Sequence, residues 1–304
     1  AVRERSIALL ALALLAGCIR EDRAGCPPSQ AGRSVVLKIV DAATGRDITE
    51  SGAAGEAELF LFSPDGTFAG RVSVGSEQVV HHVPVPLPGA DPGACRISVW
   101  ANAGEGQLLR IPADGSRIGE AAVSLIGDGD GYHGVPDDLY FGSAQPAPAG
   151  GETPEEVVVV RKNARMHITV RGLDAGLPEE RYYLTVRLPD DGYDYEGNPA
   201  GGTATIRRSG AFDDRGDLTT GAAFNVIHSG TVAEAVTVTL YERAAVRAVA
   251  DRAVIAVTEN DDGLPIALPS GRTSNLLIDL RDGTGVTIRT EITPWNEVYQ
   301  WEIW

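Results

Sequence analysis

The sequence predicts an all-β protein with two tandem antiparallel β-sandwich domains behind an N-terminal targeting segment. Past Pro28, apolar and polar residues alternate in short runs, and a period of two is typical of strands rather than helices. The 304 residues include 36 Gly and 18 Pro, which supply turns between short elements. At roughly 150 residues per domain, this length corresponds to two domains.

The first residues of the chain resemble the parts of a secretory signal peptide. Arg3 and Arg5 precede an apolar run from Ile7 to Ala16, and small residues follow before Cys18. The run has about half of the ~20 residues that a membrane-spanning helix needs. We therefore expect residues 1–17 to be removed as a signal peptide.

The ending Leu-Ala-Gly-Cys at Leu15 to Cys18 resembles the lipobox of bacterial lipoproteins. The resemblance implies cleavage before Cys18 and acylation of this residue, so that residues 18–28 tether the chain to the lipid bilayer. Several acyl chains anchor stably, because each buried methylene contributes about 0.8 kcal/mol. Glu21 and Asp22 resemble a surface-export signal, which implies exposure at the cell outer membrane. An ordinary signal peptide with an incidental cysteine is the alternative.

Two cysteines besides Cys18 would reach an oxidising compartment in an exported chain. Cys26 and Cys95 are an even pair there, which allows a Cys26–Cys95 disulfide. Two unpaired cysteines are the alternative, and spacing does not decide between them.

The N-terminal sandwich is expected over residues 29–148. Its β-rich runs are bounded by Gly, Pro and Asp, and the turn Ser63–Gly66 joins two of them, because Pro64 presets φ and Gly66 tolerates the left-handed region. The expected strands are Val35–Val40, Ala57–Phe62, Arg71–Val74 and Arg96–Trp100.

A segment rich in Pro, Gly and Ala from Gly142 to Glu156 predicts the domain boundary. The C-terminal sandwich is expected over residues 156–304, with Glu242–Ala250 as the one stretch that could form a helix. The expected strands are Val157–Val160, Met166–Val170, Tyr182–Val186, Val236–Leu240, Val254–Val257, Leu276–Leu280 and Val286–Ile292.

The composition argues against nucleic acid as a partner. Lys plus Arg number 26 against 42 Asp plus Glu, a net charge of −16, whereas phosphates require a basic surface. The chain lacks a Gly-x-Ser-x-Gly elbow, a phosphate-binding loop and a His-Glu-x-x-His motif. We expect a non-enzymatic protein without a cofactor or a metal site.

Acidic loops and histidines are the remaining candidates for chemistry. His167 alternates with Met166 and Ile168, so we expect it to face solvent or to pair locally. The acidic clusters Asp128–Asp138, Asp190–Asp194 and Asp213–Asp217 are interpreted as solvated loops, with weak calcium binding as the alternative.

The C-terminus has the most unusual composition of the chain. Three of the four Trp lie within its last residues, behind a strand-like run that ends before Pro294. The run is either the final core strand or part of a surface for a partner, and an apolar tail is suited to adding a strand to the open sheet edge of another protein. The candidate partner-binding residues are Val286, Ile288, Ile292, Trp295, Val298, Trp301 and Trp304.

Several segments together resemble the fimbrial anchor lipoproteins of the FimB/Mfa type, in the expected order over nearly the whole chain past Cys18. An Asp/Gly insert at Asp128 to Asp138 departs from the pattern. Besides the lipobox, Arg20-Glu21-Asp22 and Cys26-Pro27, the segments that carry the resemblance are Leu59–Phe68, Ile97–Asn102, Leu139–Gly142 and Arg161–Gly172.

The resemblance implies two transthyretin-like sandwich domains at the base of a surface fimbrium, with a fimbrial shaft subunit as the partner. In such fimbriae a shaft subunit loses its first strand, and the C-terminal strand of a neighbour fills the groove. An anchor lipidated at Cys18 cannot lose its first strand without leaving the membrane. We therefore expect it to donate a strand from Val286–Trp304, to accept none, and to limit polymer length.

Two other functions compete with the anchor. A surface glycan-binding lipoprotein would stack Tyr193, Tyr195 and Trp295 on sugar rings. An exported hydrolase would use paired carboxylates such as Asp190 and Asp194, but no nucleophile or base accompanies them.

Overall fold

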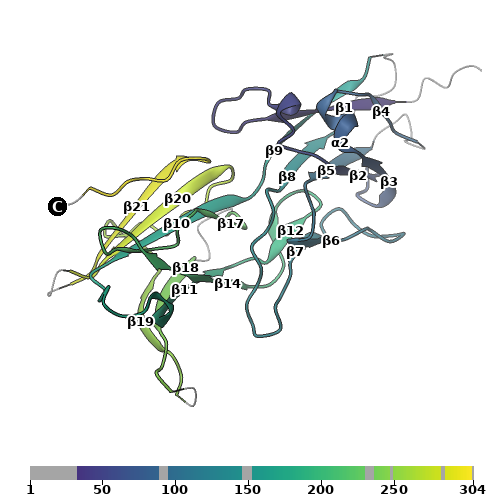
Figure 1. The fold of residues 1–304 in the computed structure, drawn as a ribbon. Helices are drawn as coiled ribbons and strands as arrows, with labels where there is room; N and C mark the ends of the chain where they lie inside the picture. The colour runs from purple at the N-terminus through teal and green to yellow at the C-terminus, as the bar shows by residue number, and fades with distance from the viewer. Residues whose placement is uncertain are drawn as a thin grey trace, which may run out of the picture. The chain divides into compact units, whose positions relative to one another are not determined.

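A seven-stranded sheet takes up most of the first part of the chain (Figure 1). The computed structural model describes residues 33–88, 95–145, 153–229, 236–246, 249–281 and 285–302. The predictions for residues 1–32, which include Cys18 and Cys26, and for Trp304 lie outside these ranges. In spatial order the strands are β3 (Phe68–Val74), β2 (Ala57–Phe62), β5 (Arg96–Ala101), β8 (Tyr140–Ala144), β9 (Glu155–Arg161), β1 (Ser34–Val40) and β4 (Val85–Pro86).

Both faces of this sheet are covered. Val35, Leu37 and Ile39 of β1 alternate into one hydrophobic core, which also takes up Val79 of α2 (Ser76–Val80). A 3₁₀ turn, η2 (Thr49–Ser51), contributes the Thr49 hydroxyl, which accepts a hydrogen bond from the Ile39 amide at 2.8 Å. Residues of opposite parity enter a second core, because successive strand residues point to opposite faces. Among these are Phe60, Phe62, Trp100 and Phe141.

A four-stranded sheet combines segments from distant parts of the sequence. Its order is β13 (Pro199–Ala200), β12 (Gly192–Asp194), β7 (Ala121–Leu125) and β6 (Gln107–Leu109). A Cβ on Gly192 would lie 1.8 Å from the Val123 carbonyl oxygen, so only glycine allows β12 to approach β7 this closely. Tyr193 of β12 is fully buried and packs against Trp100, with ring centroids 5.4 Å apart.

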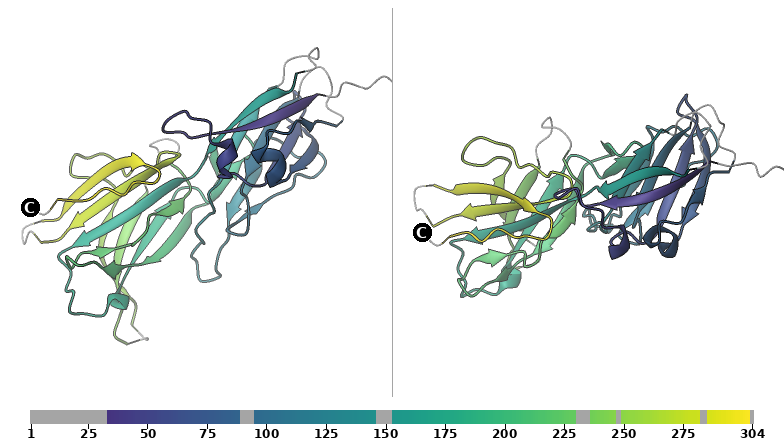
Figure 2. Two further views of the ribbon diagram at one scale, coloured as in Figure 1. Left: turned by 45° about the horizontal axis from the view of Figure 1, so that its top comes forward. Right: turned by 90° about the horizontal axis from the view of Figure 1, so that it is seen from above.

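The C-terminal part of the chain contains two further sheets. One has the order β14 (Ala204–Ser209), β11 (Tyr182–Leu188), β18 (Thr237–Glu242) and β19 (Arg252–Val257), with the 3₁₀ turn η3 (Glu179–Arg181) leading into β11. The six-stranded sheet has β15 (Ala211–Phe212), β16 (Leu218–Thr219), β10 (Ala164–Arg171), β20 (Arg272–Asp279) and β21 (Thr287–Pro294) in order, and β17 (Phe224–Val226) also pairs with β10. Figure 2 shows β10, β20 and β21 side by side in both views.

The two sheets of this part enclose a common core by strand alternation. Even-numbered residues of β10 and β20, such as Ile168 and Leu276, point inward with Leu184 of β11 and Leu240 of β18. The odd-numbered residues of β10 and β20 therefore form the opposite, outer face of the six-stranded sheet.

The all-β prediction is confirmed, but the strand pairing is not purely antiparallel. β1 pairs with β9 in parallel from Val35–Glu155 to Val40–Val160, and β10 pairs with β20 in parallel from Arg165–Thr273 to Arg171–Asp279. A parallel partner must be reached by a crossover, so it cannot come from a short hairpin between neighbouring runs.

Two strands pair across the boundary expected between Gly142 and Glu156. β9 joins the seven-stranded sheet through β8 and β1, and β12 pairs with β7. From Arg33 onward the chain clusters as one compact unit. The division into tandem domains 29–148 and 156–304 therefore stays a prediction.

The stretch Glu242–Ala250, which could form a helix by its sequence, contains no helix in its described residues. Glu242 ends β18, and the backbone donors that follow are used elsewhere: the Arg243 amide donates to the Arg181 carbonyl at 2.7 Å, and the Ala244 amide to the Asp251 carboxylate at 2.9 Å. The helical elements that do occur in the described ranges are short, and none has the length and hydropathy of a membrane span.

Candidate functional site: the C-terminal segment and its seat

The first predicted partner-binding residues belong to β21 or precede it. β21 pairs antiparallel with β20 at every position from Thr287 to Pro294 and forms the edge of its sheet. Ile288 is 9% exposed and joins the core, whereas Ile292 and Val286 are 42% and 40% exposed. The run therefore forms the edge strand of the chain's own sheet with Ile288 as its core residue, and its role as a partner surface stays a prediction.

The C-terminal segment, defined here as Trp295–Glu302, follows the outer face of the six-stranded sheet. The Trp295 carbonyl accepts a hydrogen bond from Thr273 Oγ1 at 2.8 Å, and the Tyr299 amide donates to Asn275 Oδ1 at 3.0 Å. Thr273 and Asn275 alternate on the outer face of β20. The segment therefore runs alongside β20 in the same direction, and none of its described residues is part of a strand.

Trp295 anchors the start of the segment between two arginines. Its ring centroid lies 4.1 Å from the Arg161 guanidinium carbon and 4.3 Å from that of Arg165. Arg161 ends β9, Arg165 lies in β10, and Asp138 pairs with both. Cation–π contacts are strongest where the cation is desolvated, and Trp295 is 6% exposed.

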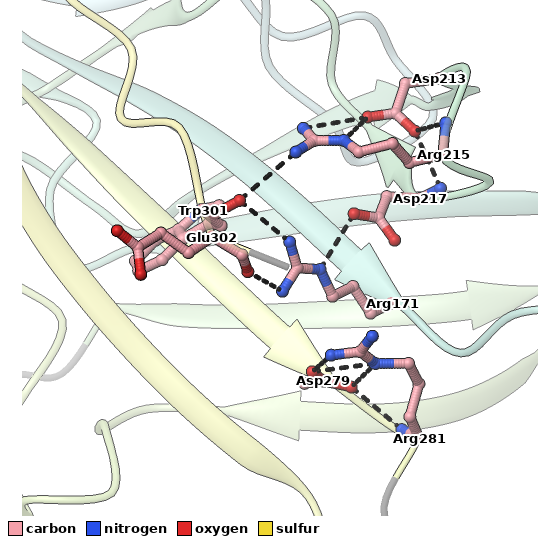
Figure 3. Close-up of polar contacts among 8 residues, drawn as sticks. All are labelled: Arg171, Asp213, Arg215, Asp217, Asp279, Arg281, Trp301 and Glu302. Carbon is pink, nitrogen blue, oxygen red and sulfur yellow. Dashed lines mark hydrogen bonds and ion pairs between the residues drawn. The ribbon is translucent and has the colours of Figure 1, made fainter. Parts of the chain in front are cut away.

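Arg171 holds the far end of the segment (Figure 3). Its Nη1 donates to the Glu302 carbonyl at 3.0 Å and its Nη2 to the Trp301 carbonyl at 3.2 Å. Its Nε donates to Asp217 at 2.9 Å. Arg215, which pairs with Asp213, also donates to the Trp301 carbonyl at 3.3 Å.

This arrangement explains how an arginine can be buried on a strand. Arg171 is 3% exposed, and a buried charge is tolerated only when it is paired and its donors are bonded. Asp217 supplies the opposite charge, and the planar guanidinium presents its remaining donors to the two carbonyls. The C-terminal segment thus accepts the remaining hydrogen bonds of the Arg171 guanidinium, which β10 places on the outer face of the sheet.

The C-terminal segment covers the outer face only in part. A groove of about 1030 Å³ lies between the segment and the β20–β21 hairpin. Its lining includes Leu277, Asp279, Arg289, Glu291, Tyr299 and Trp301.

The remaining predicted tail residues divide between buried and exposed positions. Trp301 is 8% exposed, and its ring packs edge-on against Tyr299 at 4.8 Å. Val298 is half-buried. Trp295 and Trp301 both lie outside the two hydrophobic cores formed by the described residues.

Sequence reasoning did not identify the side chains that hold the tail. Four of these residues alternate with inward-pointing residues of β10 and β20, a pattern that indicates a solvent-facing surface, whereas Arg161 ends β9 and Arg215 lies in a loop. Of the two alternatives for His167, exposure to solvent is wrong: it is 6% exposed, burial lowers the pKa of His167, and its ring is hydrogen-bonded to the Gly221 backbone. Arginine and threonine at alternate positions were the available signal, and this signal is weak. The side chains that hold the tail are Arg161, Arg165, Arg171, Arg215, Thr273 and Asn275.

The aromatic residues proposed for glycan stacking are buried. Tyr193 and Tyr195 are 0% and 2% exposed, and the Tyr195 hydroxyl donates to the Arg110 carbonyl at 2.6 Å. Rings in these positions cannot stack on a sugar at the surface. The structure therefore removes the two mid-chain residues on which the glycan-binding alternative depended.

The acidic clusters serve the backbone of their own loops. Asp194 accepts hydrogen bonds from the Glu196 and Asn198 amides at 2.9 and 2.8 Å, and Asp213 accepts from the Arg215 and Asp217 amides at 2.9 and 3.0 Å. Such bonds form Asx turns. Within the described ranges, no group of three His, Cys, Asp or Glu side chains could hold a metal ion.

Cys95 is buried and forms no disulfide with another described residue, and burial raises the pKa of its thiol. Cys26 lies outside the described residues. The Cys26–Cys95 disulfide therefore stays a prediction.

Comparison with known proteins decides the family. The sequence model of the fimbrillin-A associated anchor proteins Mfa1 and Mfa2 matches residues 23–301. The chain belongs to this family of fimbrial anchor proteins. The resemblance found in the sequence is thereby confirmed, and the family is one of anchor proteins rather than an enzyme class.

Individual family members agree in sequence and fold. The major fimbrium anchoring subunit FimB of Porphyromonas gingivalis is 27% identical over 305 residues, which cover 96% of this chain and 94% of FimB. The solved structure of the fimbrial anchor protein Mfa2 from Porphyromonas gingivalis has a TM-score of 0.63 at 12% identity, over 88% of this chain and 100% of that chain. The Mfa2 match shows a shared fold.

Proposed function

We propose that this chain tethers a fimbrium to the outer membrane through acylated Cys18 and joins the fimbrial shaft by donating Trp295–Trp304 as an added strand. One observation carries the second half of the proposal. The C-terminal segment is held on the surface by side chains, whereas β21 before it is paired at every residue with β20. The segment can leave without breaking a β-ladder.

The sequence of the segment suits an added strand with one apolar face. In an extended conformation, the five odd-numbered residues project to the same side, and all except Glu297 have large apolar side chains: Trp295, Tyr299, Trp301 and Ile303. Main-chain hydrogen bonds to the partner sheet would supply affinity, and pockets for these side chains would fix the register. This period of two places Val298 and Trp304 on the opposite side of the strand.

The residues of β21 are better assigned to the chain's own sheet than to the donated strand. Withdrawing β21 would break its pairing with β20 and remove Ile288 from the core. We therefore assign Val286, Ile288 and Ile292 to the base from which the donated segment extends.

The position of β1 supports a terminating role. β1 lies between β9 and β4, so its loss would open a gap inside the seven-stranded sheet. Cleavage after β1 would also separate the rest of the chain from the lipid at Cys18. An anchor of this design keeps β1, accepts no strand, and thereby limits polymer length at the cell surface.

The test is a crosslinking pull-down from intact membranes that compares the full chain with one ending after Pro294. This truncation leaves β21 complete. Capture of a fimbrial shaft subunit by the full chain alone supports strand donation. Capture by both chains moves the interface off the tail, and failure of the full chain to capture any shaft subunit refutes the anchor proposal. A Gln300→Ser chain of full length serves as the matched control.

A further inference from the structure

We propose that the outer face of β10 and β20 is a binding site for an extended polypeptide main chain, with Arg171 as its anchoring residue. Its occupant is the chain's own segment Trp295–Glu302, which must be released before donation. The site itself is independent of any fimbrial partner. Only the consequence for donation rests on the proposed function.

The anchor points match the length of an extended peptide. Thr273 meets Trp295 at one end, and Arg171, which is in register with Asp279, meets Glu302 at the other. At about 3.3 Å per residue, the six steps from Thr273 to Asp279 span roughly 20 Å. The C-terminal segment begins with a turn, in which the Glu297 amide donates to the Pro294 carbonyl at 3.0 Å, and its seven steps from Trp295 would span about 23 Å if fully extended. Seven helical steps would rise only about 10 Å, so past this turn the site selects an extended ligand.

The polar contacts of the site are hydrogen bonds to main-chain groups of the C-terminal segment. Thr273, Asn275 and Arg171 bond carbonyl or amide groups of the tail, and Arg215 adds a second donor to the Trp301 carbonyl. The aromatic anchor of Trp295 between Arg161 and Arg165 supplies the register. The chemical class of the ligand is therefore an extended peptide that begins with an aromatic residue.

The site is built by groups that do not belong to the tail. Asp217, 8% exposed, fixes the Arg171 guanidinium from the side opposite the tail, and the Asp217 amide is itself bonded to Asp213 at 3.0 Å. β10 is held in place by β16, β17 and β20. When the C-terminal segment leaves, Arg171 therefore stays in position, and its Nη1 and Nη2 donors remain available for another main chain.

The tail is attached by a few separate contacts. It lacks the continuous ladder of β21, and the groove beside it leaves one flank uncovered. Removing one anchor should therefore release a large share of the binding. This property distinguishes a detachable ligand from a strand of the fold.

The experiment is hydrogen–deuterium exchange on the full chain, comparing wild type with Arg171→Lys. Lysine keeps the charge beside Asp217 but is a point donor that cannot hold the carboxylate and two carbonyls together. We expect exchange within Trp295–Glu302 to accelerate at least tenfold, with β10, β20 and β21 unchanged. Arg252→Lys is the control, because Arg252 pairs with Glu242 on a different sheet.

A second variant guards against loss of folding. Thr273→Val keeps the shape of a buried side chain and removes the donor to the Trp295 carbonyl, so exchange of the tail should also rise. Unchanged tail exchange in both variants overturns the site. Acceleration spread equally over β10 and β20 also overturns it, because Arg171 would then act on the fold rather than on a ligand.

Capture of the shaft subunit by the same variants separates this inference from the proposed function. Faster tail exchange together with faster capture supports both. Faster tail exchange with no shaft subunit captured by any chain leaves the site standing and refutes donation.

Discussion

The Arg171 guanidinium donates to the Asp217 carboxylate at 2.9 Å, and the two residues are only 3% and 8% exposed. This ion pair lies on the outer face of a sheet rather than inside a core. It is buried because the C-terminal segment crosses above it and accepts two further hydrogen bonds from Arg171. Arg171 therefore both forms the buried ion pair with Asp217 and binds the C-terminal segment to the sheet.

Arg171→Ala should lower the free energy of unfolding by about 3 kcal/mol or more. The substitution leaves the Asp217 carboxylate buried without its partner, and removing one member of a buried ion pair typically costs about 3–5 kcal/mol. Urea unfolding followed by circular dichroism measures the loss. Arg252→Ala, at an exposed pair with Glu242, should change the midpoint little. Equal losses in the two variants would contradict the role assigned to burial.

Strand positions could be predicted from the sequence, because alternation and turn residues are local signals. Val35–Val40, Ala57–Phe62 and Tyr182–Val186 all fall within observed strands. Pairing is not local. No run of the sequence shows that β9 lies parallel to β1 or that Gly192 admits β12 beside β7.

Only one part of the candidate site, the aromatic C-terminal segment, could be predicted from the sequence. The surface that this segment covers is formed by polar positions of β10, where Arg165 and Arg171 alternate with core residues. Alternation assigns such residues to a face and cannot tell solvent from a covering segment. Only the path of Trp295–Glu302 shows that this face is covered.

His228 should make the fold less stable as the pH falls from about 6.5 toward 4. Burial, with a smaller contribution from the positive charge of Lys162, lowers the pKa of His228 to about 4. The unfolded chain therefore binds a proton at a higher pH than the folded chain, and stability present above pH 6.5 declines until the folded state is protonated too. A loss of about 3 kcal/mol is the upper range of this effect.

Denaturant unfolding at pH 7 and at pH 4.5 measures the effect of His228 when wild type is compared with His228→Gln. Glutamine can still bond the Tyr193 hydroxyl, which lies 3.1 Å from His228 Nδ1. We expect the pH-dependent loss to shrink in the variant. An identical loss in both chains would assign it to other groups.

Cys18→Ala should abolish acylation and release the chain from the membrane. The lipid is the sole attachment that we propose, and several acyl chains are needed for stable anchoring. Metabolic labelling with palmitate, followed by separation of membrane and soluble fractions, tests this prediction. Retention of the variant in the membrane fraction would require another attachment, and palmitate on the variant would exclude Cys18 as the acylated residue.

Cys26 and Cys95 should be bridged in the mature protein. Because Cys95 is buried, the native chain would resist alkylation whether or not it is bridged, so the protein must first be unfolded without reductant. We expect no alkylation under these conditions and alkylation of both residues after reduction, read by mass spectrometry. Alkylation of both residues before reduction would refute the disulfide.

Trp301→Ser should reduce capture of the shaft subunit at least tenfold, whereas Gln300→Ser should leave capture close to wild type. In an extended donated strand these neighbours point to opposite sides, and the side of Trp301 also carries Trp295 and Tyr299, whereas the side of Gln300 carries Trp304 alone among the aromatic residues. Burying a large apolar side chain contributes about 1.5–3 kcal/mol, and 1.4 kcal/mol corresponds to a tenfold change in affinity.

The same two variants also separate donation from docking on the chain's own sheet. Arg171 bonds the main-chain carbonyl of residue 301, which Trp301→Ser keeps. The substitution should therefore weaken docking on the chain's own sheet less than it weakens binding in a pocket of the shaft subunit. Quantified crosslinking from intact membranes measures capture, and hydrogen exchange of Trp295–Glu302 measures docking. Equal loss of capture in the two variants would show that the tail is not read as a strand with alternating faces. Loss of capture in Trp301→Ser alone would show that the donated strand turns the side of Trp301 toward the shaft subunit.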